Sequence, residues 1–596
     1  MVFEERLSHY KKEAKSLTKT YNILGILRLI VFILAAFFTY AVWKLGFNLT
    51  YGICLAISYV AFIILVVYHK NISDKLQYAK GMIGINKNYI DRTNGKWVNF
   101  KDCGEEFIDR NHPYSFDLDI VGNKSLFQLI NTTNTFIGRE KLSKSLLNPD
   151  FDIEIIKKRQ DAIKELSSKL EFCQSIENSA YRDREKLQNP TFLFEYGNEK
   201  KKIINKGFIK RILYILPIIT VPISLALILF KGTLGFKLAF LIIAIQLLIW
   251  VMGLNKINES FYEISKFKSG FDGYYNLLKL IENEEFKSEL LKELKEKLFE
   301  TGNESLKGMK DLNKIMNKIN LRFNTFFMVP LNGIFLWDYQ CIFHLESWNE
   351  KYGDNIEMWL SLIGELESLI SFSVLMHIND NITMCEINDK SLKIKAINLG
   401  HPLINSSIRV CNDLNMDDEI FVITGSNMSG KTTFLRTIGI NLVLAYNGAP
   451  VCAKDMVASK VQIYTSMRIS DDLKNGVSTF YAELVRIKQI IDYSNKNSKM
   501  IFLIDEIFRG TNSVDRITGA KNVLANLNKL GAIGLITTHD LELCALETKN
   551  RIKNFHFAEH YNENKILFDY KLKSGRSTST NAKYLMKMIG INILEE

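Results

Sequence analysis

The chain has 596 residues, 47% of them hydrophobic, and a formal net charge of +11 at neutral pH. Its eight scattered cysteines form no Cys-x-x-Cys pair, which argues against a disulfide or zinc framework. Only eight prolines, without low-complexity tracts, argue against long disordered linkers. Much of the positive charge flanks apolar stretches, so it is not by itself evidence for nucleic-acid binding.

Four apolar stretches are each long enough to cross a bilayer, which takes roughly 20 residues. They cover residues 22–43, 49–68, 212–230 and 234–252, and very short connections pair them into two hairpins. A buried core helix is the alternative for any one of them, but four in paired arrangement favour a membrane. The first leads directly into a second span, unlike a cleaved signal peptide. We therefore expect a helix at residues 1–21 and transmembrane hairpins at 22–70 and 205–253.

The distribution of lysine and arginine predicts the orientation of these hairpins. Basic residues precede the first span, follow the second and precede the third. By the positive-inside tendency, the N-terminus, the middle of the chain and the C-terminal half face the cytoplasm. We therefore expect a multi-pass protein of the cell membrane. The basic residues are Lys11, Lys12, Lys15, Lys19, Lys70, Lys75, Lys80, Lys200, Lys201, Lys202, Lys206, Lys210 and Arg211.

Helix-rich regions lie on both sides of the second hairpin, at residues 105–200 and 255–390. In the later region, charged stretches carry apolar residues at helical spacing, as at Leu290, Leu291, Leu294 and Leu298. An ordinary helical bundle accounts for this pattern.

A phosphate-binding loop is predicted where an apolar strand at residues 421–424 runs into Gly-x-x-x-x-Gly-Lys-Thr and then a helix. In such a loop the backbone N–H groups surround the phosphates of a nucleotide, a lysine reaches them, and a threonine hydroxyl joins Mg²⁺. A Gly-rich turn without a ligand has no use for this lysine and threonine. The predicted ATP-binding residues are Gly425, Ser426, Asn427, Met428, Ser429, Gly430, Lys431, Thr432 and Thr433.

Two further strands predict the rest of a nucleotide site. Residues 500–504 form a continuous apolar run, as expected for a buried parallel strand, and end in Asp505 and Glu506. Asp505 can hold Mg²⁺ together with Thr432, and Glu506 can polarise the attacking water. The strand at 533–537 is followed by His539, which we expect to contact the γ-phosphate or the water.

These motifs resemble those of the MutS family of DNA mismatch-recognition ATPases. The loop at 424–433 has that family's Asn-Met pair, and residues 505–512 resemble its Asp-Glu-Ile-Gly-Arg-Gly-Thr segment, with Phe508 in place of a glycine. Residues 470–483 resemble its signature loop and helix, and residues 400–403 the entry to its ATPase domain. Upstream, residues 118–163 resemble the start of its helical core.

The resemblance implies an α/β P-loop ATPase domain of the ABC class at residues 391–596. It also implies a helical core at 105–200 with returning lever helices at 255–390, beside the four transmembrane helices. ATP and Mg²⁺ are the implied cofactors. The family also implies a homodimer in which Gly476, Ser478 and Thr479 of one subunit meet the γ-phosphate held by the other. Val410 stands at the adenine-contact position, and the neighbouring Arg409 could stack on the base.

Departures from the family bear on the substrate. The helical core begins near Phe116, so we expect neither a mismatch-reading domain nor a connector domain. Residues 261–263 imitate the Phe-x-Glu mismatch-reading motif, but they lie in a charged helical stretch. We expect a dimeric ATPase whose levers act on DNA without mismatch specificity. The alternatives are a membrane-remodelling or signalling ATPase, or a nucleotide-gated scaffold, that does not bind DNA.

Lysines on the lever helices are the candidates for contacts with DNA phosphates, although such residues more often form a solvated helix face. They are Lys292, Lys295, Lys297, Lys307 and Lys310.

Overall fold

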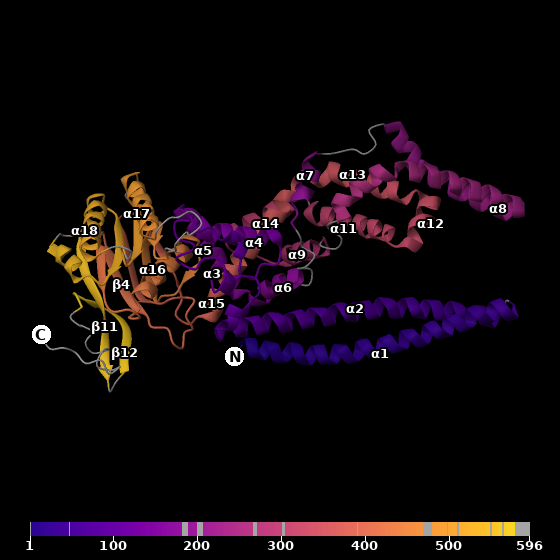
Figure 1. Cartoon of the computed structure of the whole chain (residues 1–596). Coiled ribbons are helices and arrows are strands. Elements are labelled where there is room, and N and C mark those ends of the chain that lie inside the picture. The colour runs from indigo at the N-terminus through magenta and orange to yellow at the C-terminus, as the bar shows by residue number, and fades with distance from the viewer. Residues whose placement is uncertain are drawn as a thin grey trace.

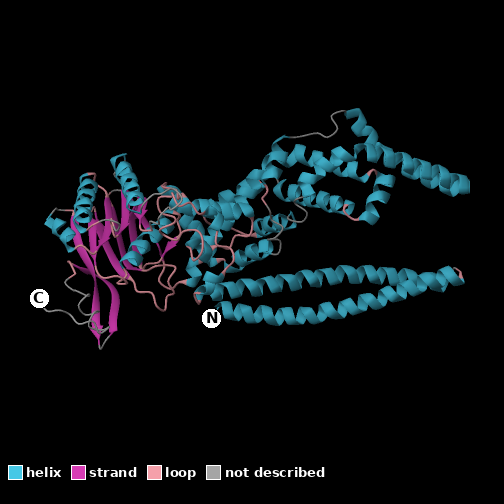
Figure 2. Ribbon diagram, viewed as in Figure 1, coloured by secondary structure: helices cyan, strands magenta, loops and turns pink. Residues whose placement is uncertain are grey.

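The computed structural model describes the chain except for residues 1, 47, 182–188, 200–206, 266–270, 301–303, 390, 469–478, 497–498, 509–511, 549–550, 563–564 and 578–596. The described parts form an elongated molecule (Figure 1). A domain built on a β-sheet lies at one end, a helical body follows, and long helices extend away from the sheet (Figure 2).

The first helical hairpin consists of α1 (Val2–Leu45) and α2 (Leu49–Thr93), which run side by side (Figure 1). Near the body the two helices are packed: Tyr21 stacks on His69 with ring centroids 4.2 Å apart, and Met82 and Tyr89 are buried. The distal halves expose large apolar side chains, among them Phe37 with 59% exposure. The predicted spans 22–43 and 49–68 fall in these halves.

The second hairpin lies within α8 (Gly207–Ser265), whose backbone breaks at Gly232, with φ 52° and ψ −128°. This break separates the predicted spans 212–230 and 234–252. In the described part of the chain, four helical stretches are long and apolar enough to cross a membrane. The most apolar window of the stretch Trp337–Ile378 is 78% buried within the protein, so this stretch is a core element, and the other three are α1, α2 and α8.

The helical body surrounds α14 (Ile356–Ser373), one of its most buried helices. Gly364 lets α14 approach α4 closely, since a Cβ there would lie 2.7 Å from Ile137 Cγ2. The buried Glu367 accepts hydrogen bonds from the backbone N–H of Asn134 and Thr135, at 3.0 and 3.3 Å. The other helices of the body are α3 (Leu126–Ile130), α4 (Phe136–Leu147), α5 (Ile153–Ser168), α6 (Leu170–Tyr181), α7 (Thr191–Glu199), α9 (Phe271–Asn283), α10 (Glu289–Phe299), α11 (Glu304–Arg322), α12 (Thr325–Phe335), α13 (Trp337–Tyr352) and α15 (Leu375–Ile378).

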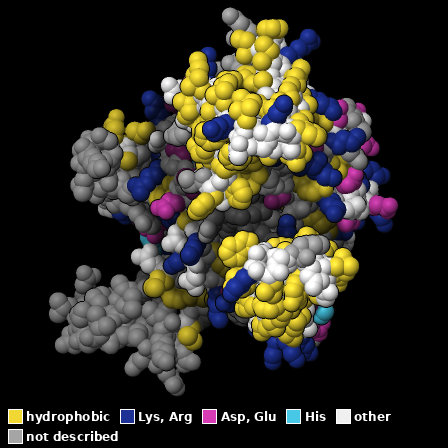
Figure 3. Space-filling view, turned by 90° about the vertical axis from the view of Figure 1, so that its right-hand side faces the viewer, with side chains coloured by type: hydrophobic (Ala, Val, Ile, Leu, Met, Phe, Trp, Pro, Cys, Tyr) yellow, Lys and Arg dark blue, Asp and Glu magenta, His cyan; other side chains and the backbone are white. Residues whose placement is uncertain are grey.

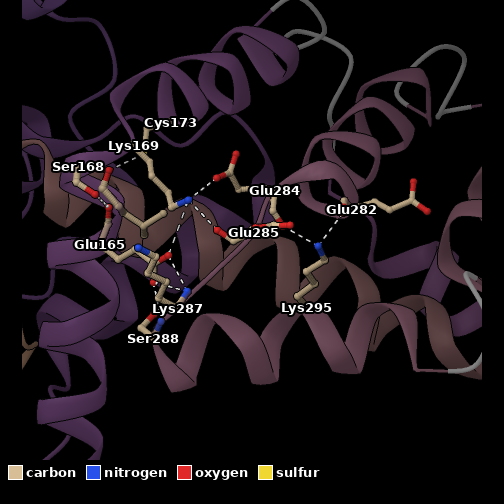
Figure 4. Close-up of polar contacts among 11 residues, drawn as sticks. Glu165, Ser168, Lys169, Cys173, Glu282, Glu284, Glu285, Lys287, Ser288 and Lys295 are labelled. Carbon is tan, nitrogen blue, oxygen red and sulfur yellow. Dashed lines mark hydrogen bonds and ion pairs between the residues drawn. The ribbon is translucent and has the colours of Figure 1, made fainter.

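A polar junction joins α5 to the turn between α9 and α10 (Figure 4). Glu165 accepts from the backbone N–H of Lys287 and Ser288, at 2.8 and 2.7 Å, and so caps the N-terminus of α10. Burial alone would raise the pKa of the Glu165 carboxyl, but these hydrogen bonds and the charge of Lys169 lower it below its usual value. Lys169 in turn pairs with Glu284 at 2.5 Å.

The C-terminal domain contains a six-stranded sheet in the order β12-β11-β5-β10-β9-β8, in which every neighbouring pair but β12-β11 is parallel. Strands β5, β9 and β10 are buried along their whole length, as predicted for central parallel strands. Their carboxyl ends meet at one edge, the usual place for a ligand. The elements are β5 (Ile420–Thr424), α16 (Lys431–Tyr446), β8 (Gln462–Ser466), α17 (Thr479–Lys496), β9 (Met500–Asp505), α18 (Ser513–Lys529), β10 (Ile533–Thr538), β11 (Ile552–Asn562) and β12 (Lys565–Ser574).

A smaller sheet packs beside the first, in the order β2-β7-β3-β4. Its strands are β2 (Glu386–Asn388), β3 (Lys393–Leu399), β4 (Asn412–Asp417) and β7 (Asp455–Ser459), and the short strands β1 (Thr383–Met384) and β6 (Pro450–Val451) pair separately.

Candidate nucleotide site

The predicted phosphate loop joins β5 to α16 and is shaped by two glycines with positive φ, Gly425 at 148° and Gly430 at 105°. Lys431 begins α16 and is buried. Its Nζ donates to the carbonyl oxygens of Gly425 and Ser426, at 2.7 and 2.8 Å, so the lysine closes the loop from within. The buried hydroxyl of Ser429 has no hydrogen-bond partner among the described residues. This orphan donor is available to a phosphate oxygen.

The carboxylate of Asp505, at the end of β9, is held between two threonines. Thr432 Oγ1 donates to Asp505 Oδ2 at 2.8 Å, and Thr537 Oγ1 donates to Asp505 Oδ1 at 2.6 Å. Asp505 and Thr432, predicted from the sequence as metal ligands, therefore lie side by side. Thr537, on β10, was not predicted.

Asp505 and Thr432 are suited to bind Mg²⁺ together with the phosphates of a nucleotide. No cluster of three or more His, Cys, Asp or Glu side chains able to hold a metal occurs in the part of the chain that the structure describes. Asp505 and Thr432 supply a carboxylate and a hydroxyl oxygen, which leaves the other positions of an octahedral ion to water and phosphate.

The predicted catalytic residues lie together at the same edge. Glu506 has a positive φ of 52°, and its N–H is held by the carbonyl and hydroxyl oxygens of Thr537, at 3.1 and 3.0 Å. His539 Nε2 lies 3.1 Å from Glu506 Oε1 and 3.0 Å from Asn427 Oδ1. The imidazole thus bridges the acid after β9 and the phosphate loop.

Phe508 stands where the resembling family has a glycine, and it adopts the conformation that a glycine would favour, with φ 62°. Its ring is buried edge-on against Phe480, with centroids 5.8 Å apart, and over Gly519. Its N–H donates to the carboxylate of Glu483 on α17. Packing and this hydrogen bond offset the strain of the left-handed backbone.

Arg409 does not offer its guanidinium to a base. It donates to the carbonyl oxygen of Ile404 and, at 2.8 Å, to Asn379 Oδ1, and it lies 2.7 Å from Cys452 Sγ. The hypothesis that Arg409 stacks on adenine is therefore not supported by its position. Its neighbour Val410 is half-buried.

Two residues beside the loop were missed in the sequence. Tyr570 on β12 is half-exposed, and a Cβ on Gly430 would lie 3.1 Å from its Cδ1. The Tyr570 carbonyl oxygen accepts from Asn412 Nδ2 at 3.0 Å, which fixes the strand beside the Val410 segment. Glu559 on β11 accepts from Ser426 Oγ at 2.6 Å. No local pattern marks either residue, because strand pairing brings them to the loop from a distance in the sequence.

The predicted partner-facing segment is outside the described residues at Gly476 and Ser478. Thr479 begins α17.

Comparison with protein families gives two matches: residues 113–206 match MutS domain III, and residues 421–592 match MutS domain V. Over these two segments the chain is similar to MutS-family domains. Domain V is the P-loop ATPase domain of that family, which confirms the predicted domain class, and MutS-family proteins are ATPases.

Three relatives show how far the similarity extends, and each is called "DNA mismatch repair protein MutS". The protein of Aquifex pyrophilus is 29% identical over 79% of this chain and 59% of its own length. That of Staphylococcus epidermidis is 31% identical over 40% of this chain and 28% of its own. That of Methanosarcina acetivorans is 31% identical over 38% and 26%. This chain therefore spans less than two thirds of each of these relatives.

Proposed function

We propose that this chain is a membrane-anchored MutS-type ATPase that couples the binding and hydrolysis of ATP to motion of its helical body. One observation carries the proposal. Lys431 is hydrogen-bonded inside the phosphate loop, and beside it Asp505 accepts from the hydroxyls of Thr432 and Thr537. Family membership of the domain supports the same reaction class.

Each residue has a role that follows from its position. On ATP binding, Lys431 exchanges two carbonyl oxygens for phosphate oxygens, and the loop N–H groups and Ser429 hydroxyl donate to the same phosphates. Thr432 and Asp505 would hold Mg²⁺, whose charge would offset the charge that develops on the phosphates. Glu506 orients the attacking water or accepts a proton from it. His539, which contacts both Glu506 and Asn427, holds the Glu506 carboxylate in position.

Tyr570 is the residue that we assign to the adenine base. Its half-exposed ring lies next to Gly430, at the mouth of the loop, and an aromatic face stacks on any base. Arg409 is occupied by Ile404, Asn379 and Cys452, so it does not compete for this role.

The ATPase domain is tied to the helical body through two aspartates ahead of α3. Asp119 pairs with Arg436 on α16 at 3.0 Å and with Arg468 at 2.5 Å. Asp117 accepts from Thr465 Oγ1 at 2.6 Å and from the N–H of Arg468 at 2.9 Å. Arg468 directly precedes the segment 469–478 that we expect to meet the partner's nucleotide. A conformational change in that segment would therefore reach the helical body through Arg468 and the two aspartates.

The dimer is part of the proposal. We expect Gly476, Ser478 and Thr479 of one subunit to complete the nucleotide site of the other. ATP binding then closes the dimer, and hydrolysis opens it.

The membrane anchor is supported by the exposure of the apolar helices. The most apolar windows of α1, α2 and α8 are only 11%, 6% and 11% buried, although an apolar helix in a folded body is normally covered. Lysines beside the spans favour a cytoplasmic location for the body and the ATPase domain.

DNA is the proposed partner of the levers, on the strength of the relatives' names. One lysine that we considered for phosphate contact has another role: Lys295 Nζ donates to the carbonyl oxygens of Glu282 and Glu284, at 2.7 and 2.6 Å, and caps α9 (Figure 4). That finding favours the DNA-independent alternative. Binding of the purified chain to matched and mismatched duplex over a salt series separates the two. DNA binding should weaken steeply with salt and be equal for both duplexes, whereas no binding at low salt favours the alternative.

The ATPase assignment is tested with two variants of the full chain. Lys431→Ala should lose ATP binding. Glu506→Gln should bind ATP and hydrolyse it roughly 10²- to 10⁴-fold more slowly, the usual contribution of a general base. Equal turnover by Glu506→Gln and the parent chain would overturn the assignment of the base.

A further inference from the structure

Helix α12 presents a bare apolar surface that the four predicted spans do not include. It joins α11 to α13 at the end of the helical body far from the sheet (Figure 1). Phe326 is 89% exposed and Phe327 51%, and Val329 is also exposed. The last turn of α11 adds Leu321 and the turn that follows adds Phe323, likewise exposed. An apolar cluster of this size on a water-facing surface needs an occupant.

The position of α12 on α8 identifies that occupant. A Cβ on Gly333 would lie 3.0 Å from Ile243 Cγ2 and 3.3 Å from Leu247 Cγ, so the two helices touch. Gln246, a polar residue of the fourth predicted span, is hydrogen-bonded to Thr220. With its amide in the orientation that satisfies both its oxygen and its nitrogen, Gln246 also donates to the carbonyl oxygens of Gly333 and Ile334. The second hairpin is therefore bonded to α12 as well as to itself.

The contact also sets a depth. Ile243 and Leu247 lie roughly five to nine residues inside the cytoplasmic end of the span 234–252, which is about 8–14 Å at the rise of an α-helix. One leaflet contributes about 15 Å of hydrocarbon. Gly333 and its neighbours in α12 therefore lie at the depth of the cytoplasmic leaflet.

Three side-chain hydrogen bonds satisfy polar groups at the two ends of α12, which suits a lipid contact. Asn324 caps the helix by accepting from the Phe326 N–H at 3.0 Å. At the other end Asn332 accepts from the Asp338 N–H at 2.9 Å and donates to the Met328 carbonyl oxygen, also at 2.9 Å. Leu336, in the left-handed conformation that turns the chain into α13, is fully buried.

A buried charged cluster joins residues on either side of α12. Asp338 pairs with Arg322 at 3.0 Å and accepts from Trp250 Nε1 at 2.8 Å, all three being buried. This cluster ties α8, α11 and α13 together. In the view along the hairpin tips, hydrophobic side chains gather on two separate protrusions with Lys and Arg among and around them (Figure 3).

We propose that α12 is a third membrane contact, a helix embedded in the cytoplasmic leaflet beside the second hairpin. This proposal rests on the membrane anchoring proposed above. Because α12 sits between α11 and α13, any motion of these two helices moves it within the leaflet. The bilayer is thus a surface on which the ATP-driven body acts.

Photocrosslinking of the full chain in its native membrane tests the contact. Phe326 is replaced by p-benzoyl-L-phenylalanine in one variant, Phe37 in α1 in a second, and Tyr481 in α17, 60% exposed on the ATPase domain, in a third. After irradiation, mass spectrometry identifies the adduct at each site. A variant at Phe327 provides a second probe of α12 should the first not accumulate.

Lipid adducts at positions 37 and 326 but not at 481 are the expected result. A lipid adduct at 37 together with a protein adduct, or none, at both 326 and 327 would overturn the proposal for α12 while the anchoring stands. No lipid adduct at 37 would overturn the anchoring itself and the proposal for α12 with it.

Discussion

Substitution of Thr537 should lower the rate of ATP hydrolysis, because its hydroxyl holds one oxygen of the metal-binding carboxylate of Asp505. Thr537 Oγ1 donates to Asp505 Oδ1 at 2.6 Å, and both residues are buried. Valine has nearly the shape of threonine and suits a β-strand, so Thr537→Val removes little besides the hydroxyl. That hydroxyl also accepts from the Glu506 N–H at 3.0 Å, but the Thr537 carbonyl oxygen still accepts from the same N–H at 3.1 Å. Thr537→Ser, the matched control, keeps the hydroxyl and removes only a methyl group.

The size of the effect follows from the kind of hydrogen bond. A hydrogen bond to a charged group is worth about 1.5–3 kcal/mol. Since about 1.4 kcal/mol is a factor of ten, kcat/KM for Mg-ATP should fall roughly 10- to 150-fold in Thr537→Val. The Mg²⁺ concentration for half-maximal rate should rise as well, because Asp505 is less well oriented toward the ion. Thr537→Ser should stay within a few-fold of the parent chain.

The assay is steady-state ATP hydrolysis by the purified full chain over a Mg²⁺ series. If Thr537→Val kept the parent's rate and Mg²⁺ response within two-fold, Asp505 would not be positioned by Thr537, and the assignment of Asp505 as the metal carboxylate would lose its structural support.

Three further predictions concern the dimer, the topology and the pH response. Ser478→Arg and Lys431→Ala should each inactivate homodimers, and mixing the two should partly restore hydrolysis; no recovery at any ratio would indicate a site complete within one subunit. Cysteine introduced at Asn48 or Lys231 should react with an impermeant maleimide in intact cells above the parent's background, and an unchanged signal would contradict the proposed orientation. Burial, together with the charges of Arg436 and Arg409, lowers the pKa of His401 to about 3. The unfolded chain, with a histidine pKa of about 6.5, therefore binds a proton first, and stability falls as pH drops from 6.5 toward 3, by about 2 kcal/mol at pH 5. After incubation at pH 5, His401→Asn should retain more ATPase activity, assayed at pH 7.5, than the parent chain. Equal losses in the two chains would show that His401 does not cause the loss of stability.

The nucleotide site could be anticipated from the sequence where the chemistry lies in consecutive residues. The loop 425–433 and the acids after β9 are local motifs, and parallel strands bring their carboxyl ends to one edge of a sheet. The residues that strand pairing brings in could not be anticipated. Tyr570 and Glu559 come from the β11–β12 hairpin, and Thr537 looks like any residue of a buried strand.

In the helical body too, charged and apolar sequence patterns do not show which side chains are covered. Lys295 has the sequence context of a solvated helix face, but its ammonium caps α9, and this depends on where α9 ends next to α10. The stretch Trp337–Ile378 is apolar enough for a membrane yet forms the core of the body, whereas α12, shorter than a span, is exposed. Composition cannot tell these cases apart, because it does not record which helix the body covers.

The central claim, an ATPase anchored in a membrane, is tested most directly by one fractionation. Membranes from cells that express the parent chain or Lys431→Ala are floated through a sucrose gradient at high salt, and ATP hydrolysis attributable to the chain is measured in each fraction. We expect activity that floats with the vesicles and disappears in Lys431→Ala. Activity that stays at the bottom of the gradient, or that is unchanged by the substitution, would contradict it.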